Sequence, residues 1–223
     1  MRRLVLLAAV LVLTATSLHA QIPQNVVSVM QKCNQTMNDD AQGMQVILDM
    51  KISYLVFSMK GDLVMYSKGD KNMSTFKTQV LGRTMRVDSG SDGKQNWRYS
   101  SVTNGKGEKE EPDTLLITPI DQKAKKKDDI SLEFDMHKDY NKAEMKEKNG
   151  KYEITFSQPK KADDPPKMVV VINKSNYHFY EMSTKEKGAT MRMTVKSIKK
   201  GVPDSVFVLD PKKFPGAKVV HKS

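Results

Sequence analysis

The side chains best suited to acid–base or metal chemistry are three histidines outside the first twenty residues, His137, His178 and His221. Metal sites place two or more His or Cys ligands at short spacings. None of these histidines has a second His or Cys at such a spacing. The sequence also has no glycine-rich phosphate loop and no Gly-x-Ser-x-Gly turn. We therefore expect no metal and no cofactor.

Two carboxylate pairs are the remaining candidates for catalysis, Asp128-Asp129 and Asp163-Asp164. A pair of this kind in a cleft can divide the roles of general acid and general base. Here both pairs lie beside lysines in polar stretches, where solvated loop charges are the ordinary explanation. We therefore predict that the protein is not an enzyme.

Methionine is unusually frequent in this sequence, with 15 residues in the chain. Its flexible, polarizable side chain suits a surface that adapts to ligands of variable shape, such as acyl chains. Many of these methionines and several aromatic residues fall on the apolar faces of predicted strands, which we expect to point away from water: Met50, Met65, Met85, Met182, Met191, Met193, Tyr54, Phe76, Trp97, Tyr99 and Phe156. Two interpretations stay open, an ordinary core and the lining of a cavity.

The first twenty residues have the pattern of a secretory signal peptide. Arg2 and Arg3 precede an apolar run over residues 4–13, and small or polar residues lead to a cleavage site predicted between Ala20 and Gln21. The apolar run has about half the length that a membrane span needs. Cys33 lies too far downstream to carry a lipid anchor, so we expect a soluble exported protein.

Residues 21–223 have the length of a single domain. The whole chain has a net charge of +11, and removal of residues 1–20 leaves +9. For an exported protein, this charge suits an anionic membrane surface better than nucleic acid. We interpret the lysine run at residues 123–129 as a solvated loop. Cys33 has no disulfide partner and occupies an apolar helical position, which predicts a buried thiol.

Apolar periodicity predicts one helix followed by a meander of strands. Val26, Val27, Met30 and Cys33 have helical spacing, and Pro23 suits the first turn. From residue 46 the period becomes two, which predicts a long strand over 46–59 and a turn at residues 60–62. Further strands are predicted at 63–68, 73–81, 83–88, 94–100, 144–156 (a hairpin around Asn149-Gly150), 168–172, 177–184, 189–197 and 205–209. About eleven strands in one sheet tend to curl or close.

Two stretches interrupt the meander, residues 101–129 and 157–167. Long insertions in a compact domain are usually functional or disordered. Residues 130–136 fit either a strand or a helical turn. A curled sheet of this size encloses more volume than its own side chains readily fill, so we expect a cavity or a helix that plugs it.

Four stretches of the chain resemble the LolA superfamily of periplasmic lipoprotein carriers and sorting proteins: residues 67–76, 92–100, 168–202 and 207–220. The resemblance implies a mainly β fold with short helices (α+β), in which a curled antiparallel sheet forms an incomplete barrel with an N-terminal helix and a helical or loop lid. It also implies that residues 21–223 form one LolA-like domain whose tail supplies the last strand. Where carriers of this family have an early-strand arginine that ties the lid, the comparable stretch here offers Lys60, Lys68 and Lys71, and residues 112–136 are what is available for the lid.

The function that this resemblance implies is a periplasmic carrier of the acyl chains of lipoproteins or lipids, which takes part in their sorting to the outer membrane. Its expected partners are an inner-membrane release complex, an outer-membrane acceptor and, transiently, the membrane itself; we expect a monomer that binds no nucleic acid. The alternative is a module of the same fold that senses lipid or lipoprotein, or binds a protein, and transports nothing. The residues expected to line the apolar cavity are Leu48, Met50, Ile52, Tyr54, Met65, Phe76, Met85, Val87, Trp97, Tyr99, Phe156, Met191 and Met193.

Overall fold

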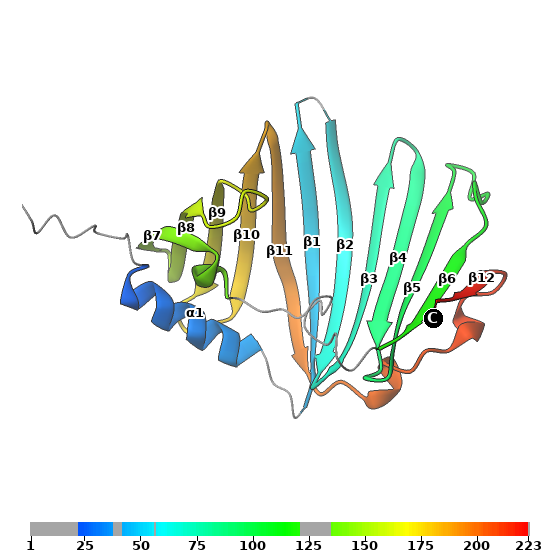
Figure 1. Ribbon diagram of the computed structural model, residues 1–223. Helices are drawn as coiled ribbons and strands as arrows, with labels where there is room; N and C mark the ends of the chain where they lie inside the picture. Colours follow the sequence, from blue (N-terminus) through cyan, green and yellow to red (C-terminus); the bar gives the residue numbers. More distant parts are fainter. Residues whose placement is uncertain (1–21, 38–41, 56, 121–134, 223) are drawn as a thin grey trace, which may run out of the picture.

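The computed structural model describes residues 22–37, 42–55, 57–120 and 135–222, which form one curled sheet with a helix against one face (Figure 1). The described chain runs through α1 (Gln24–Met37), β1 (Met44–Tyr54), β2 (Phe57–Lys68), β3 (Lys71–Val80), β4 (Arg83–Ser91), β5 (Gln95–Thr103), β6 (Thr114–Pro119), η1 (Met136–Lys138), β7 (Tyr140–Lys148), β8 (Lys151–Pro159), β9 (Lys167–Asn173), β10 (Phe179–Glu186), β11 (Ala189–Lys200), η2 (Asp204–Val206), η3 (Pro211–Lys213) and β12 (Lys218–His221). Within these ranges, no helix has the length and apolar character needed to cross a bilayer.

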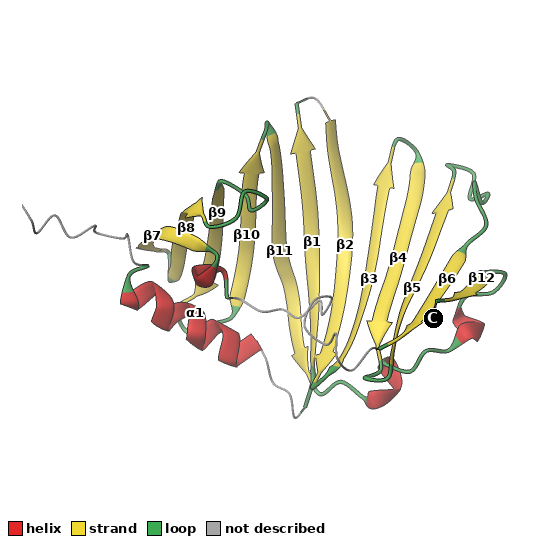
Figure 2. Cartoon of the chain, viewed as in Figure 1, coloured by secondary structure: helices red, strands yellow, loops and turns green. Residues whose placement is uncertain are grey.

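Two antiparallel meanders make up the sheet, β1–β6 and β7–β11, and they join where β1 pairs with β11. The order across the sheet is β12-β6-β5-β4-β3-β2-β1-β11-β10-β9-β8-β7. Strands dominate the architecture, and the sheet does not close on itself (Figure 2). The predicted mainly β fold, an incomplete antiparallel barrel with an N-terminal helix, is confirmed.

The hairpin turns decide where the strands end. At the predicted turn, Asn149 and Gly150 have φ of 51° and 70°, and two positive values are what a two-residue hairpin turn of this kind requires. The single strand predicted over 46–59 is wrong, because the chain reverses at Leu55 (φ 49°) and places Tyr54 opposite Phe57. Apolar residues continue through this tip without Gly, Asn or Pro, so the sequence carries no turn signal there.

The turn predicted at residues 60–62 is also wrong, since all three residues lie inside β2. Gly61 packs closely against the ring of Phe76. A Cβ atom at Gly61 would lie 2.7 Å from Cε2 of Phe76. A glycine inside a strand often allows such a close approach, so this one makes room for the Phe76 ring.

The C-terminal segment differs from its prediction as well. Residues 205–209 do not form a strand; a 3-10 turn (η2) precedes a buried Phe207, while Val208 is 59% exposed. A short apolar alternation does not distinguish a strand from a turn that buries one side chain. The last strand is instead β12, which pairs in parallel with β6, so the tail does supply a final strand, further along the chain.

Several predicted features fall wholly or partly outside the described residues. These are the signal peptide and its cleavage site, the lysine run at 123–129, and most of 130–136. Of the region assigned to a lid, residues 114–119 form β6 and belong to the sheet itself. A helical or loop lid is therefore not found at those six positions, because they form a strand that pairs with β5.

The main core lies between α1 and the face of the sheet that it covers. Met30, Cys33 and Phe156 have no exposed surface, whereas Val27 is only partly buried. Buried residues from β1, β2 and β7–β10 complete the same cluster. The predicted burial of Cys33 is confirmed, and this burial raises the pKa of its thiol to about 12.

We expect Cys33 to resist thiol reagents in the folded protein. The reactive species is the thiolate. With a pKa of about 12, the thiolate at mildly alkaline pH is about a thousandfold scarcer than for an exposed cysteine. Mass spectrometry after timed treatment with iodoacetamide should show no modification in buffer and complete modification in denaturant. Rapid modification without denaturant would mean that α1 readily leaves the sheet.

Candidate functional site

The two faces of the sheet differ in chemistry. We call the face against which α1 packs the inner face, and the opposite one the outer face. Directly opposed residues of antiparallel strands project to the same side. On the inner face, Met50 lies opposite Met193, and Ile52 lies opposite Met191. The inner face is therefore apolar across the junction of the two meanders.

The inner face continues beyond the core that α1 covers. We call this part the open apolar patch; it consists of Met50, Ile52, Tyr54, Phe76, Met85, Val87 and Met191. None of these residues belongs to the buried cluster beneath α1. Met85 is 40% exposed and Tyr54 is 47% exposed, while the other five are partly buried. Exposed apolar patches on proteins mark contact surfaces for other proteins, membranes or apolar ligands.

Eleven of the thirteen residues predicted to line a cavity lie on this inner face. Leu48, Met65 and Phe156 are buried in the core beneath α1, and Met193 packs against that core. The seven residues of the open apolar patch complete the eleven. The two remaining residues, Trp97 and Tyr99, lie elsewhere.

Trp97 and Tyr99 are on the outer face, opposite Gly90 and Asp88. There they pack against Phe214, with ring centroids 5.7 Å and 4.5 Å away, in a second cluster that contains Leu115. The structure thus separates them from the inner-face residues, and assigning them to the same lining was wrong. Alternation shows that Trp97 and Tyr99 share a face; it does not show which face of the sheet that is.

Two buried carboxylates stand beside this second cluster. The Tyr99 hydroxyl donates a hydrogen bond to Asp113 (2.7 Å), and the Lys109 ammonium lies 2.8 Å from the same carboxylate. Burial alone would raise the pKa of Asp113, but these two hydrogen bonds outweigh it and lower the pKa. Asp88, which has no exposed surface, is paired with Arg86. Each of the two carboxylates is thus paired with a cation, Asp113 with Lys109 and Asp88 with Arg86.

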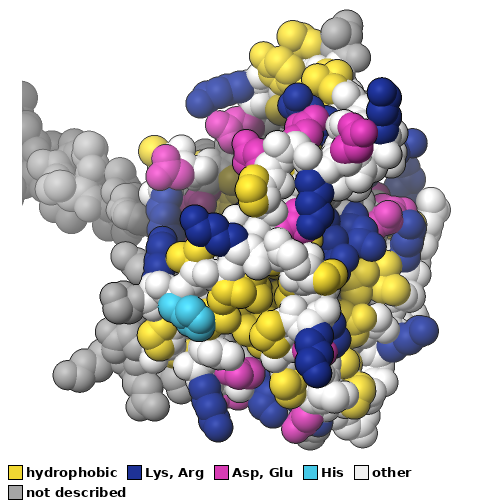
Figure 3. Space-filling model, turned by 90° about the vertical axis from the view of Figure 1, so that its right-hand side faces the viewer, with side chains coloured by type: hydrophobic (Ala, Val, Ile, Leu, Met, Phe, Trp, Pro, Cys, Tyr) yellow, Lys and Arg dark blue, Asp and Glu magenta, His cyan; other side chains and the backbone are white. Residues whose placement is uncertain are grey.

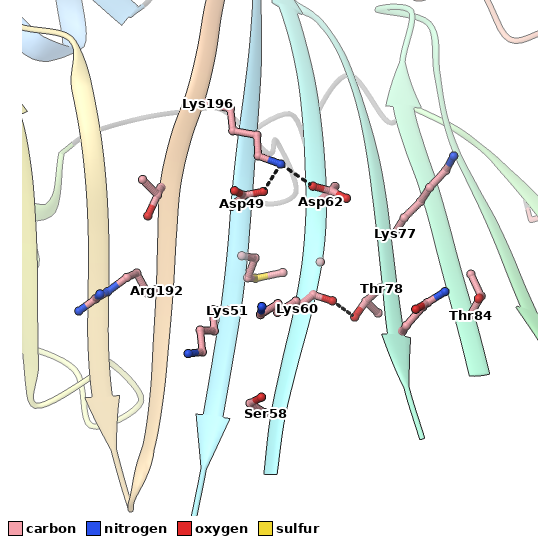
Figure 4. Close-up of a pocket in the computed structure, with 14 residues that line it drawn as sticks. Asp49, Lys51, Ser58, Lys60, Asp62, Lys77, Thr78, Thr84, Arg192 and Lys196 are labelled. Atoms are coloured by element: carbon pink, nitrogen blue, oxygen red, sulfur yellow. Dashed lines mark hydrogen bonds and ion pairs between the residues drawn. The ribbon is translucent and has the colours of Figure 1, made fainter. Parts of the chain in front are cut away.

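The outer face also holds a cleft of about 880 Å³ over β11, β1, β2, β3 and the start of β4 (Figure 4). We call it the outer cleft. Its lining residues at outer-face positions are Asp49, Lys51, Ser58, Lys60, Asp62, Lys77, Gln79, Thr84, Arg192, Thr194 and Lys196. Met50, Gly61 and Thr78, which the strand register places on the inner face, also border the cleft. Five basic and two acidic residues among the lining residues leave an excess of three positive charges. Sequence reasoning missed this cleft, because its lysines appear in the sequence only as the polar half of an alternating pattern.

A β-bulge arranges one side of the outer cleft. Val195 and Ser197 lie opposite Leu48 and Ile47, so Lys196 is an extra residue without a partner on β1. Its ammonium lies between two carboxylates, 2.5 Å from Asp49 and 3.2 Å from Asp62 (Figure 4). The hydrogen bonds with Asp49 and then Asp62 raise the pKa of Lys196. Both acids of the cleft are thereby already engaged.

The three lysines noted in the sequence, Lys60, Lys68 and Lys71, have separate locations. Lys60 is on the outer face, in the cleft. Lys68 and Lys71 flank the turn between β2 and β3 and bind Asp204, at 2.7 Å and 3.2 Å. They therefore hold the segment that follows β11 against the end of the sheet.

The histidines do not converge on one site. His137 lies in η1, His178 precedes β10, and His221 is in β12. Burial lowers the pKa of both His137 and His178, which favours their neutral forms. In the part of the chain that the structure describes, no three His, Cys, Asp or Glu residues are grouped to hold a metal ion.

Charge is spread widely over the surface. The view onto the side of the molecule to the right in Figure 1 shows hydrophobic side chains near the centre, with Lys and Arg side chains around them (Figure 3). Apolar and positively charged surface therefore occur next to each other on that side.

Comparison with known proteins identifies related folds. No family model matches the chain, and no curated protein matches its sequence significantly. An uncharacterized conserved protein from Thermus thermophilus is similar in structure, with a TM-score of 0.52, 10% identity, and coverage of 89% of this chain and 100% of that one. A LolA superfamily protein from Nitrosomonas europaea gives a TM-score of 0.39 at 10% identity, with 82% and 97% coverage. The MucA/MucB complex of Pseudomonas aeruginosa gives 0.43 at 10% identity, with 84% and 62% coverage.

Solved structures that resemble the chain thus include a LolA superfamily protein. At these identities the likeness concerns the fold alone. The chain shares its fold with the Thermus thermophilus protein.

Proposed function

We propose that the protein is a periplasmic carrier that binds the acyl chains of lipoproteins or lipids on the open apolar patch and takes part in their sorting to the outer membrane. The patch is the observation that carries this proposal. It is rich in methionine and aromatic residues, and α1 leaves it partly exposed. The signal-peptide pattern of residues 1–20 supports export, and the four LolA-like stretches support the class of ligand.

Acyl-chain binding is tested first on the wild type. The protein is produced from its full sequence, purified from the periplasm without detergent, and examined by native mass spectrometry with identification of extracted lipids. A fluorescent fatty acid is then titrated into lipid-free protein. Bound acyl species and saturable probe binding are the expected results. A ligand-free mass together with no probe binding would contradict the proposal.

We expect Met85→Asp and Met50→Asp each to weaken fatty-acid binding by about tenfold to a hundredfold. Covering a large apolar side chain contributes about 1.5–3 kcal/mol, and a carboxylate there would also have to be desolvated. Val208→Asp is the matched control: it introduces the same charge at a residue that is 59% exposed and lies outside the patch. Circular dichroism would check folding. Equal loss of binding in all three variants would contradict a specific role for the patch.

The alternative, a sensing or protein-binding module of the same fold, makes a different prediction about the loaded protein. A carrier gives up its acyl cargo to outer-membrane vesicles, whereas a sensor keeps its cargo and forms a lasting complex with another protein. Transfer of a labelled lipoprotein to such vesicles would support the carrier, and retention with a stable periplasmic complex would support the sensor.

A further inference from the structure

We propose that the outer cleft binds an anion that carries phosphate groups. The first observation is a row of three cations on neighbouring strands. Arg192 of β11 lies directly opposite Lys51 of β1, and Lys51 lies directly opposite Lys60 of β2. Figure 4 shows the three at nearly the same level of the sheet. This arrangement is independent of acyl-chain binding, which concerns the other face.

Without a bound anion, this row of three cations lowers the stability of the sheet. Like charges directly opposite each other on adjacent strands destabilise a sheet. Arg192 is relieved in part by Glu181, at 3.4 Å. Among the described residues, Lys51, Lys60 and Lys77 have no ion-pair partner within 4 Å, since the two acids of the cleft are bound to Lys196. The cleft therefore keeps positive charge that a bound anion would neutralise.

The chemistry of the lining favours phosphate over a single carboxylate. Neighbouring strands are about 4.8 Å apart, so the row presents cations at regular intervals over roughly 10 Å. The Arg192 guanidinium offers paired donors that match the oxygens of a phosphate group. Hydroxyl groups of Ser58 and Thr84 also line the cleft and can donate to further oxygens. A ligand with at least two negative charges would satisfy this set.

The decisive variant replaces two members of the row. In Lys51→Gln/Lys60→Gln, the cleft loses two of the three cations of the row, while its shape and polarity change little. Both side chains are exposed, so the variant is expected to fold and to lose like-charge repulsion. The matched control is Lys148→Gln/Lys151→Gln, which removes another directly opposed lysine pair of the same sheet, outside the cleft.

Calorimetric titration with inorganic pyrophosphate measures the site directly. We expect saturable binding by the wild type that weakens as salt is added. We expect about a tenfold or greater loss of affinity in Lys51→Gln/Lys60→Gln and little change in the control, because hydrogen bonds to charged groups are the stronger ones. Absence of saturable binding to both pyrophosphate and the vesicles described next, or an equal loss in the control, would overturn the proposal.

A second arm distinguishes the source of the phosphate. Co-sedimentation is measured with vesicles of phosphatidylcholine alone and with vesicles of equal parts phosphatidylcholine and phosphatidylglycerol. Binding to the mixed vesicles that Lys51→Gln/Lys60→Gln loses and the control keeps would assign the cleft to lipid headgroups. Pyrophosphate binding without vesicle binding would support the site with a soluble phosphate compound as its ligand.

Discussion

Phe156→Ala is expected to lower the free energy of unfolding by about 3–5 kcal/mol, the usual cost of deleting a fully buried aromatic side chain. Phe156 has no exposed surface and lies in the core between α1 and the sheet. Its ring centroid is 5.6 Å from that of Tyr140, so the substitution also removes an aromatic pair. Denaturant unfolding of the full chain, followed by circular dichroism, would measure the change.

The control for this prediction is Leu81→Ala. Leu81 is 87% exposed at the tip between β3 and β4, so its truncation should change stability by no more than about 0.5 kcal/mol. A loss below about 1 kcal/mol for Phe156→Ala would mean that the core beneath α1 readily collapses around the missing ring. That result would also weaken the distinction between a packed core and an open patch on the inner face.

The second large effect is expected at the other end of the chain. Phe214→Ala should cost about 3 kcal/mol and release the C-terminal segment before the sheet unfolds. Phe214 is 7% exposed and packs on Trp97 and Tyr99. β12 has only four residues and pairs with β6 alone, so the aromatic contact is its principal anchor. Limited proteolysis with mass spectrometry should show early cleavage after residue 203 in this variant.

Val219→Ala serves as its control within the same segment. Val219 is 47% exposed, and alanine keeps the backbone hydrogen bonds of β12. This variant should therefore resist proteolysis as the wild type does. Equal protection of Phe214→Ala would show that backbone pairing with β6, and not the aromatic cluster, retains the segment.

The sequence predicts features whose causes are local. α1 follows from helical spacing of apolar residues, and the hairpin at Asn149 and Gly150 follows from side chains that tolerate positive φ. The predicted burial of Cys33 succeeds for the same reason. Each of these depends on neighbours within a few positions along the chain.

Local sequence patterns could not predict features that depend on contacts between distant parts of the chain. Trp97 and Tyr99 alternate correctly, yet the face they occupy is set by the contact with Phe214, more than a hundred residues away. The outer cleft depends on the pairing of β1 with β11 and on a bulge at Lys196, neither of which has a local signal. All seven residues of the open apolar patch were predicted as apolar positions because they alternate within predicted strands.

The pairing of β1 with β11 also bears on how the protein assembles. Leu48 lies opposite Val195, so the middle of the sheet joins one of the earliest strands of the chain to one of the latest. Contacts between residues so far apart in sequence carry a large entropic cost and slow folding. Each meander can form from local hairpins, whereas their junction requires almost the entire chain to be present. The centre of the finished sheet, where the apolar patch and the basic cleft lie back to back, is therefore the part that we expect to form last.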